Sequence, residues 1–228
     1  MKRVFITGAN RGIGLCLVRG YLAANWSVHA TYRTPDDSQQ LLQLAEQYPE
    51  LKCHQLDVTD YQRVKQLADC LPALDLLINN AGYYGPKSTS FGQTDVEQWR
   101  KVLEINTIAP LKLVEALYPR LNEGQLKKIA CLSSKVGSMT ENSAGGGYIY
   151  RSSKAALNSV VKSLSNDLMP YGFTVLALHP GWVQTDMGGP NALISPEQSA
   201  SSLMQLIDAS DQSQSGQFFN YDGSPIPW

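Results

Sequence analysis

The chain has 228 residues, a formal net charge of −1 and 17% charged residues. This near-neutral balance, without a long block of like charge, argues against a nucleic-acid-binding surface. The four cysteines have no C-x-x-C spacing, so neither a metal site nor a disulfide framework is predicted, and each is expected to be a small buried hydrophobe. No apolar stretch approaches the roughly 20 residues that cross a bilayer, and no signal-peptide core follows Met1. We therefore expect one cytoplasmic domain over residues 1–228, without membrane insertion.

Short apolar runs alternate with helically spaced apolar residues along the chain. The predicted strands are residues 2–7, 26–32, 51–56, 74–78, 128–132, 173–178 and 216–220. The predicted helices are residues 13–22, 36–48, about 61–70, one from about 95 onward, 150–168 and 196–207. This alternation is typical of an α/β domain.

Helix signals refine three of these elements. Thr59 or Asp60 is the expected N-cap of the third helix, and Pro196 suits the first turn of the last one. In the helix that starts near residue 95, Pro110 cannot donate a hydrogen bond to the carbonyl of Asn106. We expect this helix to bend or restart there, leaving a carbonyl that could hold a water.

A glycine-rich turn, residues 8–14 with the sequence GANRGIG, joins the first strand to the first helix. Such a turn lets backbone amides and the positive helix end approach a pyrophosphate closely. Its spacing is G-x-x-x-G-x-G and not the commoner G-x-G-x-x-G. Tight strand–helix packing alone is the alternative explanation for its three glycines.

The second strand ends in Tyr32 and Arg33, at the place where an acidic residue would accept a hydrogen bond from the 2′-hydroxyl of NAD. A guanidinium there suits the 2′-phosphate of NADP instead. Arg11, inside the glycine turn, can converge on the same phosphate in this kind of fold. From two charge-assisted contacts we expect NADPH to be preferred over NADH by about 10 to 10³. A solvated arginine at a strand end is the plainer alternative for Arg33 taken alone.

Tyr150 and Lys154 stand four residues apart at the head of the helix over residues 150–168, so both lie on one face. A lysine ammonium beside a tyrosine lowers the pKa of the phenol toward neutrality, which suits proton exchange with an alcohol or carbonyl oxygen. Alone, this pair more often belongs to an amphipathic surface helix. Tyr148 would point to a different face. His179, before Pro-Gly, is expected to be a turn element and neither a base nor a metal ligand.

The residues Thr7-Gly8-x-x-x-Gly12-Ile13-Gly14, Asn79-Asn80-Ala81-Gly82, Ser134, Tyr150-x-x-x-Lys154 and Pro180-Gly181 occur in this order along the chain. In this respect the chain resembles the short-chain dehydrogenase/reductase family over essentially its whole length. Residues 147–158, 179–187 and 220–228 look like a narrower branch, the C-factor and sniffer-like carbonyl reductases. The resemblance implies a single-domain, Rossmann-type, doubly wound parallel sheet of seven strands in the order 3-2-1-4-5-6-7. It also implies an NADP(H)-dependent oxidoreductase that reduces a carbonyl to an alcohol.

The resemblance further implies a role for each site residue. Tyr150 would be the general acid, Lys154 would lower its pKa and hold the nicotinamide ribose, and Ser134 would donate to the substrate oxygen. Asn106 would hold the water of a proton relay that reaches Lys154. The implied cofactor-binding residues are Gly8, Asn10, Arg11, Gly12, Ile13, Gly14, Arg33, Asp57, Val58, Asn80, Ala81, Gly82, Tyr150, Lys154, Pro180, Gly181, Val183 and Thr185. Of these, Asp57 and Val58 would contact the adenine, and Asn80 the adenosine ribose region. Pro180, Val183 and Thr185 would contact the nicotinamide end.

The residues expected at the mouth of the substrate pocket are Tyr83, Tyr84, Met139, Trp182 and Met187, with residues 188–194 as a lid. Their apolar and aromatic character favours an apolar or aromatic ketone, aldehyde or quinone over a sugar or a charged acid. The segment between Ser134 and Tyr150 is a few residues longer than is usual in the family and contains three consecutive glycines, residues 145–147. The resemblance therefore leaves this wall of the pocket undefined.

Two other functions stay open at this point. A signalling or cofactor-sensing protein can use the same scaffold, and an alcohol dehydrogenase would use the same residues in the oxidative direction. The complete set of Asn, Ser, Tyr and Lys favours an enzyme with a small-molecule substrate. The family also implies a possible homodimer, through the helix after Asn106 and the Tyr150 helix, and the candidate contacts are Leu113, Leu117, Leu157 and Val161.

Overall fold

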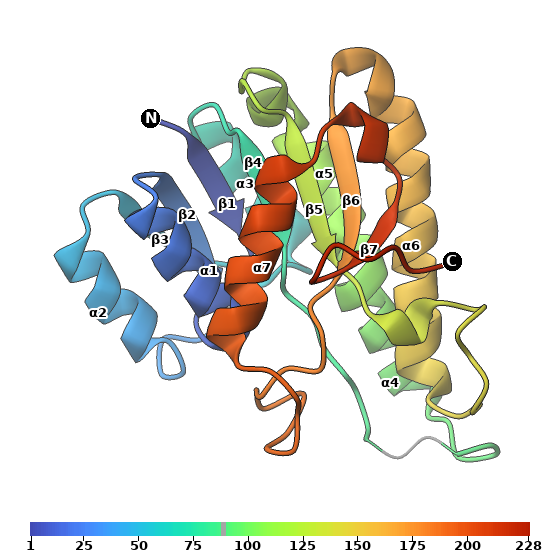
Figure 1. The fold of residues 1–228 in the computed structure, drawn as a ribbon. Helices are drawn as coiled ribbons and strands as arrows, with labels where there is room; N and C mark the ends of the chain where they lie inside the picture. Colours follow the sequence, from blue (N-terminus) through green and yellow to red (C-terminus); the bar gives the residue numbers. More distant parts are fainter. Residues whose placement is uncertain (88–89) are drawn as a thin grey trace.

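The computed structural model describes residues 1–87 and 90–228. Its centre is a parallel sheet of seven strands in the order β3-β2-β1-β4-β5-β6-β7, drawn in Figure 1 with helices in front of it and behind it. The sheet order implied by the sequence is thus confirmed. After β3 the chain returns to place β4 beside β1, and this reversal creates a crevice at the carboxyl ends of the two strands.

The element bounds follow the predictions closely. The strands are β1 (Arg3–Ile6), β2 (Ser27–Tyr32), β3 (Leu51–Gln55), β4 (Leu76–Asn79), β5 (Lys128–Leu132), β6 (Thr174–His179) and β7 (Phe218–Asn220). The helices are α1 (Gly12–Ala23), α2 (Gln39–Gln47), α3 (Tyr61–Cys70), α4 (Val96–Leu103), α5 (Ala109–Asn122), α6 (Tyr148–Leu168) and α7 (Pro196–Ala209). Two helix starts differ: α6 begins two residues earlier than expected, and α2 begins later because residues 34–38 form a turn in which the Ser38 hydroxyl donates to the Thr34 carbonyl.

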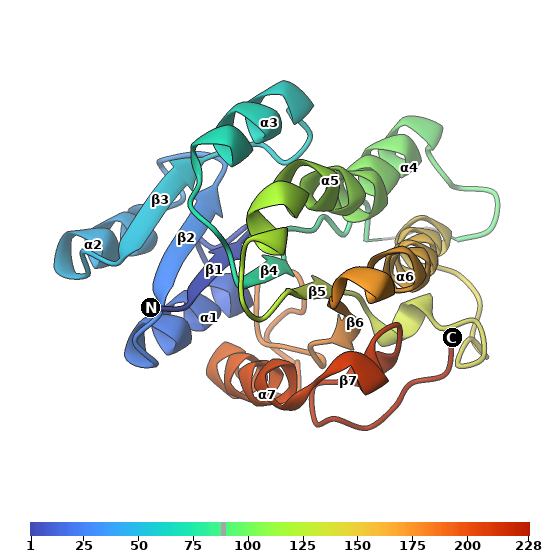
Figure 2. The same cartoon turned by 90° about the horizontal axis from the view of Figure 1, so that it is seen from above.

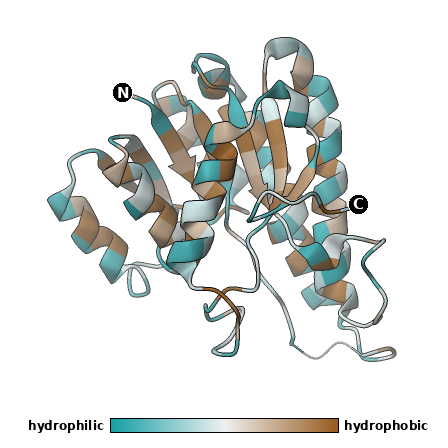
Figure 3. Cartoon of the chain, in the orientation of Figure 1, coloured by the Kyte–Doolittle hydropathy of each residue, from teal (hydrophilic) through white to brown (hydrophobic). Residues whose placement is uncertain are grey.

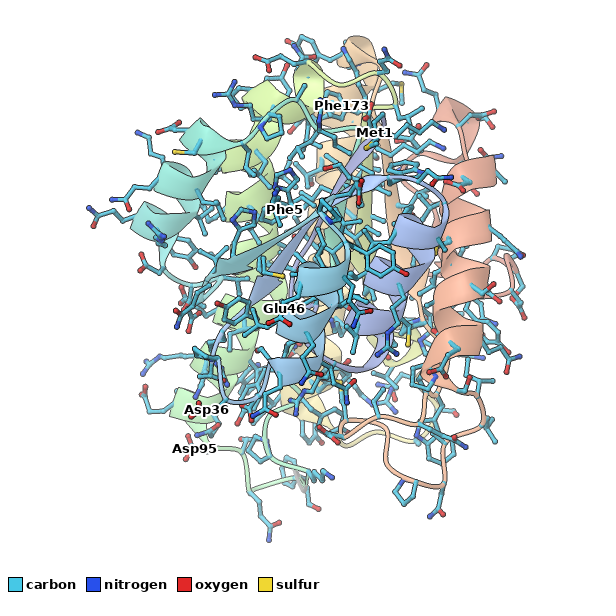
Figure 4. The ribbon with its side chains drawn as sticks, turned by 90° about the vertical axis from the view of Figure 1, so that its left-hand side faces the viewer. Met1, Phe5, Asp36, Glu46, Asp95 and Phe173 are labelled. Carbon is cyan, nitrogen blue, oxygen red and sulfur yellow. The ribbon has the colours of Figure 1, made fainter. Side chains whose placement is uncertain are left out.

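Helices cover both faces of the sheet, as Figure 2 shows from above. Alternate strand residues point to opposite faces, so Val4 and Ile6 join the cluster under α1, α2 and α7, whereas Phe5 joins the cluster under α3, α5 and α6. Both faces of the strands are therefore apolar, and Figure 3 shows the sheet as the most hydrophobic layer. In Figure 4, Phe5 and Phe173 lie within the molecule, whereas Asp36, Glu46 and Asp95 lie on its surface.

Side-chain caps fix three helix starts. The Asp60 carboxylate accepts a hydrogen bond from Arg63 N at 3.0 Å, and the Asp95 carboxylate accepts one from Gln98 N at 2.9 Å. Ser195 Oγ accepts one from Gln198 N at 3.1 Å, and Pro196 occupies the first turn of α7. The expected N-cap at residue 60 and the expected proline position are both confirmed.

A π-helical turn, Glu104–Ile108, joins α4 to α5. Pro110 has no N–H to give to the carbonyl of Asn106, so the α-helical pattern cannot continue through this position. The predicted irregularity is therefore present, and it takes the form of a wide turn inside one continuous helix.

The expectations about the dimer contacts were wrong, and those about the cysteines were confirmed only in part, since Cys16 and Cys53 are partly buried. The proposed dimer contacts Leu113, Leu117, Leu157 and Val161 are at most 2% exposed and pack in the chain's own core, so they cannot face a partner. Cys70 is exposed, whereas Cys131 is fully buried as expected. No helix within the described residues combines the length and the apolar character that crossing a membrane requires.

Candidate active site

The polar motifs of the sequence meet at the carboxyl edge of the sheet, which is the lower edge in Figure 1. The glycine turn follows β1, Asn80 follows β4, Ser134 follows β5 and Pro180 follows β6. A cavity of about 710 Å³ opens here, lined on one side by Ser134, Tyr150 and Arg151 and on the other by residues 179–183 and Thr185. Its position at the reversal of strand order is the usual place for a ligand in an open α/β sheet.

The glycine turn packs tightly against the strand ends. A Cβ at Gly8 would lie 2.9 Å from Ala81 Cα, and one at Gly14 would lie 2.5 Å from the Gly8 carbonyl oxygen. Gly8 and Gly12 also have positive φ values, 60° and 53°. The packing explanation therefore holds for Gly8 and Gly14, and the turn has the conformation that only glycine adopts without strain.

The N-terminus of α1 is chemically suited to a pyrophosphate. Arg11, its N-cap residue, is extended, with φ −156°, and its side chain does not cap the helix; the first turn has no acidic residue. The first amides of α1 are thus left with their positive dipole end unneutralised among the described residues. This terminus fits an anionic dinucleotide.

Thr7 belongs to the glycine motif of the sequence, which gave it no role of its own, and the structure shows that it positions the loop after β4. Its hydroxyl oxygen accepts hydrogen bonds from Asn80 N and Ala81 N, both at 3.0 Å. The Asn80 side-chain amide donates to the carbonyls of Thr7 and Gly8, both at 2.8 Å. Asn80 therefore holds the glycine turn in place, and its side-chain donors are engaged with backbone.

Tyr150 and Lys154 lie together beside Ser134. The ammonium of Lys154, 4% exposed, is 5.6 Å from the centroid of the Tyr150 ring and donates to the Leu132 carbonyl at 2.9 Å. Burial lowers the pKa of Lys154 to about 8. Burial also raises the pKa of Tyr150 above its ordinary value, Tyr84 raises it further, and Ser134 lowers it by a hydrogen bond. The expected lowering of the Tyr150 pKa is thus wrong for this structure, because desolvation of the phenol raises that pKa instead.

Asn106 and Lys154 approach each other around Gly82. A Cβ at Gly82 would lie 3.5 Å from Asn106 Oδ1 and 3.8 Å from Lys154 Nζ. The Asn106 side chain accepts from Tyr83 N at 2.8 Å and donates to the Tyr83 carbonyl at 2.8 Å and to Ser153 Oγ at 3.0 Å. The side chain thus braces the loop after β4, which leaves the main-chain carbonyl as the group able to hold a water.

The adenosine end is more open. Arg11 forms an ion pair with Asp186 at 2.5 Å, with both side chains largely exposed, and Arg33 is exposed at the end of β2. The Asp57 carboxylate accepts from Thr59 N and Thr59 Oγ1, while Val58 is buried. The structure therefore does not bring the two arginines into contact with each other; Arg11 reaches instead to the segment after β6.

The mouth of the cavity is aromatic on one side. Tyr84 stacks on Tyr150 with ring centroids 4.5 Å apart, and Met187 Sδ is 3.9 Å from the Tyr150 hydroxyl. Trp182 Nε1 donates to the Gly188 carbonyl at 2.8 Å, which fastens the start of the expected lid. Tyr84, Trp182 and Met187 line the cavity as expected, whereas Tyr83 turns to Gln98 and Met139 is 75% exposed.

The long segment before α6 is held at several points. Ser138 Oγ donates to the Pro227 carbonyl at 2.5 Å, and Thr140 N donates to the Trp228 carbonyl at 3.1 Å. Gly145, Gly146 and Gly147 all have positive φ.

His179 also lines the cavity. Burial, with a smaller contribution from Lys135, lowers its pKa to about 4. It is therefore a neutral imidazole at neutral pH.

Comparisons with known proteins agree with this geometry. A model of the short chain dehydrogenase family matches residues 2–193. C-signal of Myxococcus xanthus is 43% identical over 159 residues, which cover 70% of this chain and 95% of that protein. The solved structure of carbonyl reductase Sniffer of D. melanogaster has a TM-score of 0.95 and 34% identity and covers 100% of both chains. That of an NADPH-bound carbonyl reductase from chicken fatty liver has a TM-score of 0.94 and 33% identity and covers 100% of this chain and 99% of that chain.

Proposed function

Because this chain belongs to the short-chain dehydrogenase family, we propose that it is an NADP(H)-dependent oxidoreductase that reduces a carbonyl compound to an alcohol. The observation that carries the proposal is that Ser134 and Tyr150 line one cavity while the ammonium of Lys154 lies 5.6 Å from the centroid of the Tyr150 ring. Asn106 lies close to Lys154. Solved carbonyl reductases of the same fold, one of them bound to NADPH, support it.

The cofactor site would be the edge that runs from the glycine turn to Thr185. The uncapped amides of α1 would bind the pyrophosphate, Val58 the adenine, and Val183 and Thr185 the nicotinamide end. NADPH, when bound, supplies the hydride that reduces the carbonyl carbon. The protein supplies position and a proton.

Ser134 and Tyr150 would bind the carbonyl oxygen, since both hydroxyls face the cavity. Tyr150 would then give its proton to the oxygen as negative charge develops there. A positioned general acid contributes about 10² to 10⁴ in rate. The buried ammonium of Lys154 would stabilise the resulting phenolate, because it is the charge held beside the tyrosine ring in a site shielded from water.

The proton must then be replaced. In this proposal the ammonium of Lys154 would pass a proton to the phenolate and recover one from a water on the Asn106 main-chain carbonyl. The proximity of the two residues supports it, since the Asn106 side chain and Lys154 Nζ both lie within 4 Å of where a Cβ on Gly82 would be. Pro110 makes this acceptor available because it lacks the N–H that would otherwise compete for it. The π-helical turn is in this proposal a functional feature, as such turns frequently are.

Tyr84, Trp182 and Met187 favour a substrate with an apolar or aromatic body, such as a ketone, aldehyde or quinone. A panel of such carbonyl compounds, followed by loss of NADPH absorbance, tests the proposal. Reduction of none of them by a protein that still binds NADPH would contradict it.

The role of Tyr150 is tested by Tyr150→Phe. We expect turnover to fall about 10²-fold or more with little change in NADPH affinity, because only an interaction of the transition state is removed. Tyr148→Phe is the matched control, since Tyr148 is 38% exposed at the start of the same helix and does not line the cavity. Equal turnover in Tyr150→Phe and the parent would refute the assignment.

The resemblance to C-signal favours a signalling or cofactor-sensing protein as the second candidate. Retention of the full set of Asn106, Ser134, Tyr150 and Lys154 argues for catalysis, since a sensor has no use for the proton donor. NADPH binding without reduction of any carbonyl compound in the panel would favour the sensor.

A further inference from the structure

The substrate end of the cavity carries an excess of positive charge. Among its lining residues are Lys87, Lys135 and Arg151 against the single carboxylate of Glu141. The whole chain, in contrast, has a net charge of −1. Cavity walls of low dielectric concentrate such a local field, so an imbalance of this sign attracts anions.

Two of these cations, Lys135 and Arg151, are adjacent in the chain to proposed catalytic residues. Lys135 follows Ser134, and Arg151 follows Tyr150 in α6. The guanidinium of Arg151 donates from Nη1 to the Val136 carbonyl at 3.3 Å, and its Nε is 3.4 Å from where a Cβ on Gly147 would lie. Arg151 is therefore braced between the segment after β5 and the start of its own helix.

The charge of Arg151 is not neutralised locally. In the part of the chain that the structure describes, no carboxylate lies within ion-pair distance of its guanidinium. Lys135 forms an ion pair with Glu141 at 3.0 Å, and the side chains of Lys135 and Glu141 are 54% and 38% exposed. Such an exposed pair is weak, so an anionic ligand can replace Glu141 as the partner of Lys135. Burial is the main cause of the lowered pKa of His179 in the cavity wall; the Lys135 ammonium lowers it further, and Asp222 opposes this by a smaller amount.

Two further carboxylates, Asp186 and Asp222, do not line the cavity. Asp186 pairs with Arg11, and Asp222 accepts hydrogen bonds from Ser224 N and Ser224 Oγ at 2.9 and 2.6 Å. The cofactor phosphates do not account for the two cations. The glycine turn, where the phosphates would bind, follows β1, whereas Ser134 follows β5, and β4 lies between these two strands. The two places are therefore about two strand spacings, roughly 10 Å, apart.

We propose that this cavity selects carbonyl substrates that carry an anionic group, a carboxylate being the simplest, which Lys135 and Arg151 recognise. The inference rests on the proposed carbonyl reduction and names its substrate class: an apolar or aromatic body against Tyr84 and Trp182, with an anion at the cationic end. It revises the expectation from the sequence, which set charged acids aside because only the apolar residues of the mouth were considered.

Two aldehydes of nearly equal size test the proposal: 4-formylbenzoate, which is anionic, and 4-formylbenzamide, which is neutral. The quantity measured is the ratio of their kcat/KM values at saturating NADPH and low salt, for the parent and for variants. The ring substituents also change the intrinsic reactivity of the aldehydes, but this difference is the same for every variant and cancels when ratios are compared.

We expect Lys135→Gln and Arg151→Gln each to lower the benzoate-to-benzamide ratio about two- to fivefold, the range for partly exposed charge pairs. Glu141→Gln should raise the ratio, because it removes the competing carboxylate and frees Lys135. Lys65→Gln, an exposed site on α3, makes the same charge change outside the cavity and should leave the ratio unchanged. The effects should shrink as salt rises, since the Debye length falls from about 10 Å at 0.1 M to about 3 Å at 1 M.

An unchanged benzoate-to-benzamide ratio in Lys135→Gln and Arg151→Gln, or a lower ratio in Glu141→Gln, would overturn the inference. The proposed function would still stand in that case, because the parent reduces both aldehydes. If the parent reduces neither these aldehydes nor the wider panel, the proposed function fails. Anion recognition is then read from calorimetric affinities of the two compounds for the NADP⁺-bound protein. Tighter binding of the benzoate that is lost in Arg151→Gln supports it, and equal affinities refute it.

Discussion

We predict that the choice between NADPH and NADH depends on Arg11 and Arg33, which the structure places in different situations. Arg33 is exposed at the end of β2, and no ion pair engages it within residues 1–87 and 90–228. Arg11 is already paired with Asp186 at 2.5 Å, so a 2′-phosphate must compete for it. Arg33 should therefore be the main determinant of cofactor choice.

The size of the effect follows from this difference. One charge-assisted hydrogen bond contributes about 1.5 to 3 kcal/mol, and discounting by about half for the exposed Arg33 leaves about 0.7 to 1.5 kcal/mol. At tenfold per 1.4 kcal/mol, this corresponds to a preference for NADPH of about three- to tenfold. This preference is below the range of about 10 to 10³ expected from the sequence and reaches only its lower limit, because the sequence estimate counted both arginines as available.

The assay is kcat/KM for NADPH and NADH with one carbonyl substrate, first at low salt and then at high salt. Arg33→Ala should bring the two cofactors close to parity, and Asp186→Asn should raise the NADPH preference severalfold by releasing Arg11. Arg19→Ala, another exposed arginine further along α1, is the matched control and should change little. Equal kcat/KM for both cofactors in the parent at low salt would show that these arginines are merely solvated, and the assignment of NADP would be withdrawn.

Three further predictions concern pH, packing and assembly. With the pKa of Lys154 lowered to about 8 by burial, kcat/KM for reduction should hold through neutral pH and fall above about pH 8 as the ammonium is lost; a flat profile to pH 10 would contradict this. Gly14→Ala should lower the free energy of unfolding by about 1 to 3 kcal/mol because its Cβ meets backbone, whereas Gly20→Ala in the same helix meets only the flexible Met204 and should change it by less than 1 kcal/mol in thermal or urea unfolding. Light scattering at micromolar concentration should show a homodimer, formed through the exposed residues of α5 and α6, such as Ile108 at the start of α5, and a monomer would refute it.

Local patterns in the sequence sufficed for most of the fold and for the centre of the site. Each strand is a short apolar run that ends at a polar or glycine-rich turn, so its carboxyl end could be located before the sheet was known. The irregular turn at Asn106 could be predicted because Pro110 has no backbone N–H, whatever the surrounding fold. Tyr150 and Lys154 share a helix, and helical spacing fixes their common face.

What could not be predicted depends on contacts between distant segments. The pairing of Arg11 with Asp186 spans 175 residues and is set by the path of the loop after β6. The inward direction of Leu113 and Leu117 could not be told from an outward one, because α5 has apolar residues on more than one side. The role of Thr7 as acceptor for two amides after β4 requires the register of β1 against β4, which local patterns do not contain.

The protonation states at the centre of the site bear on the direction of the proposed reaction. Reduction needs a tyrosine that carries its proton, and oxidation of an alcohol needs the phenolate. Burial raises the pKa of Tyr150, so the phenol is protonated at neutral pH and the acid form is ready without prior loss of a proton. In the proposed reaction the phenolate would form only as the substrate oxygen takes the proton, with the Lys154 ammonium, still charged below about pH 8, beside the ring. The burial that raises the pKa of Tyr150 would thus keep the phenol ready as the proton donor that the proposed carbonyl reduction requires.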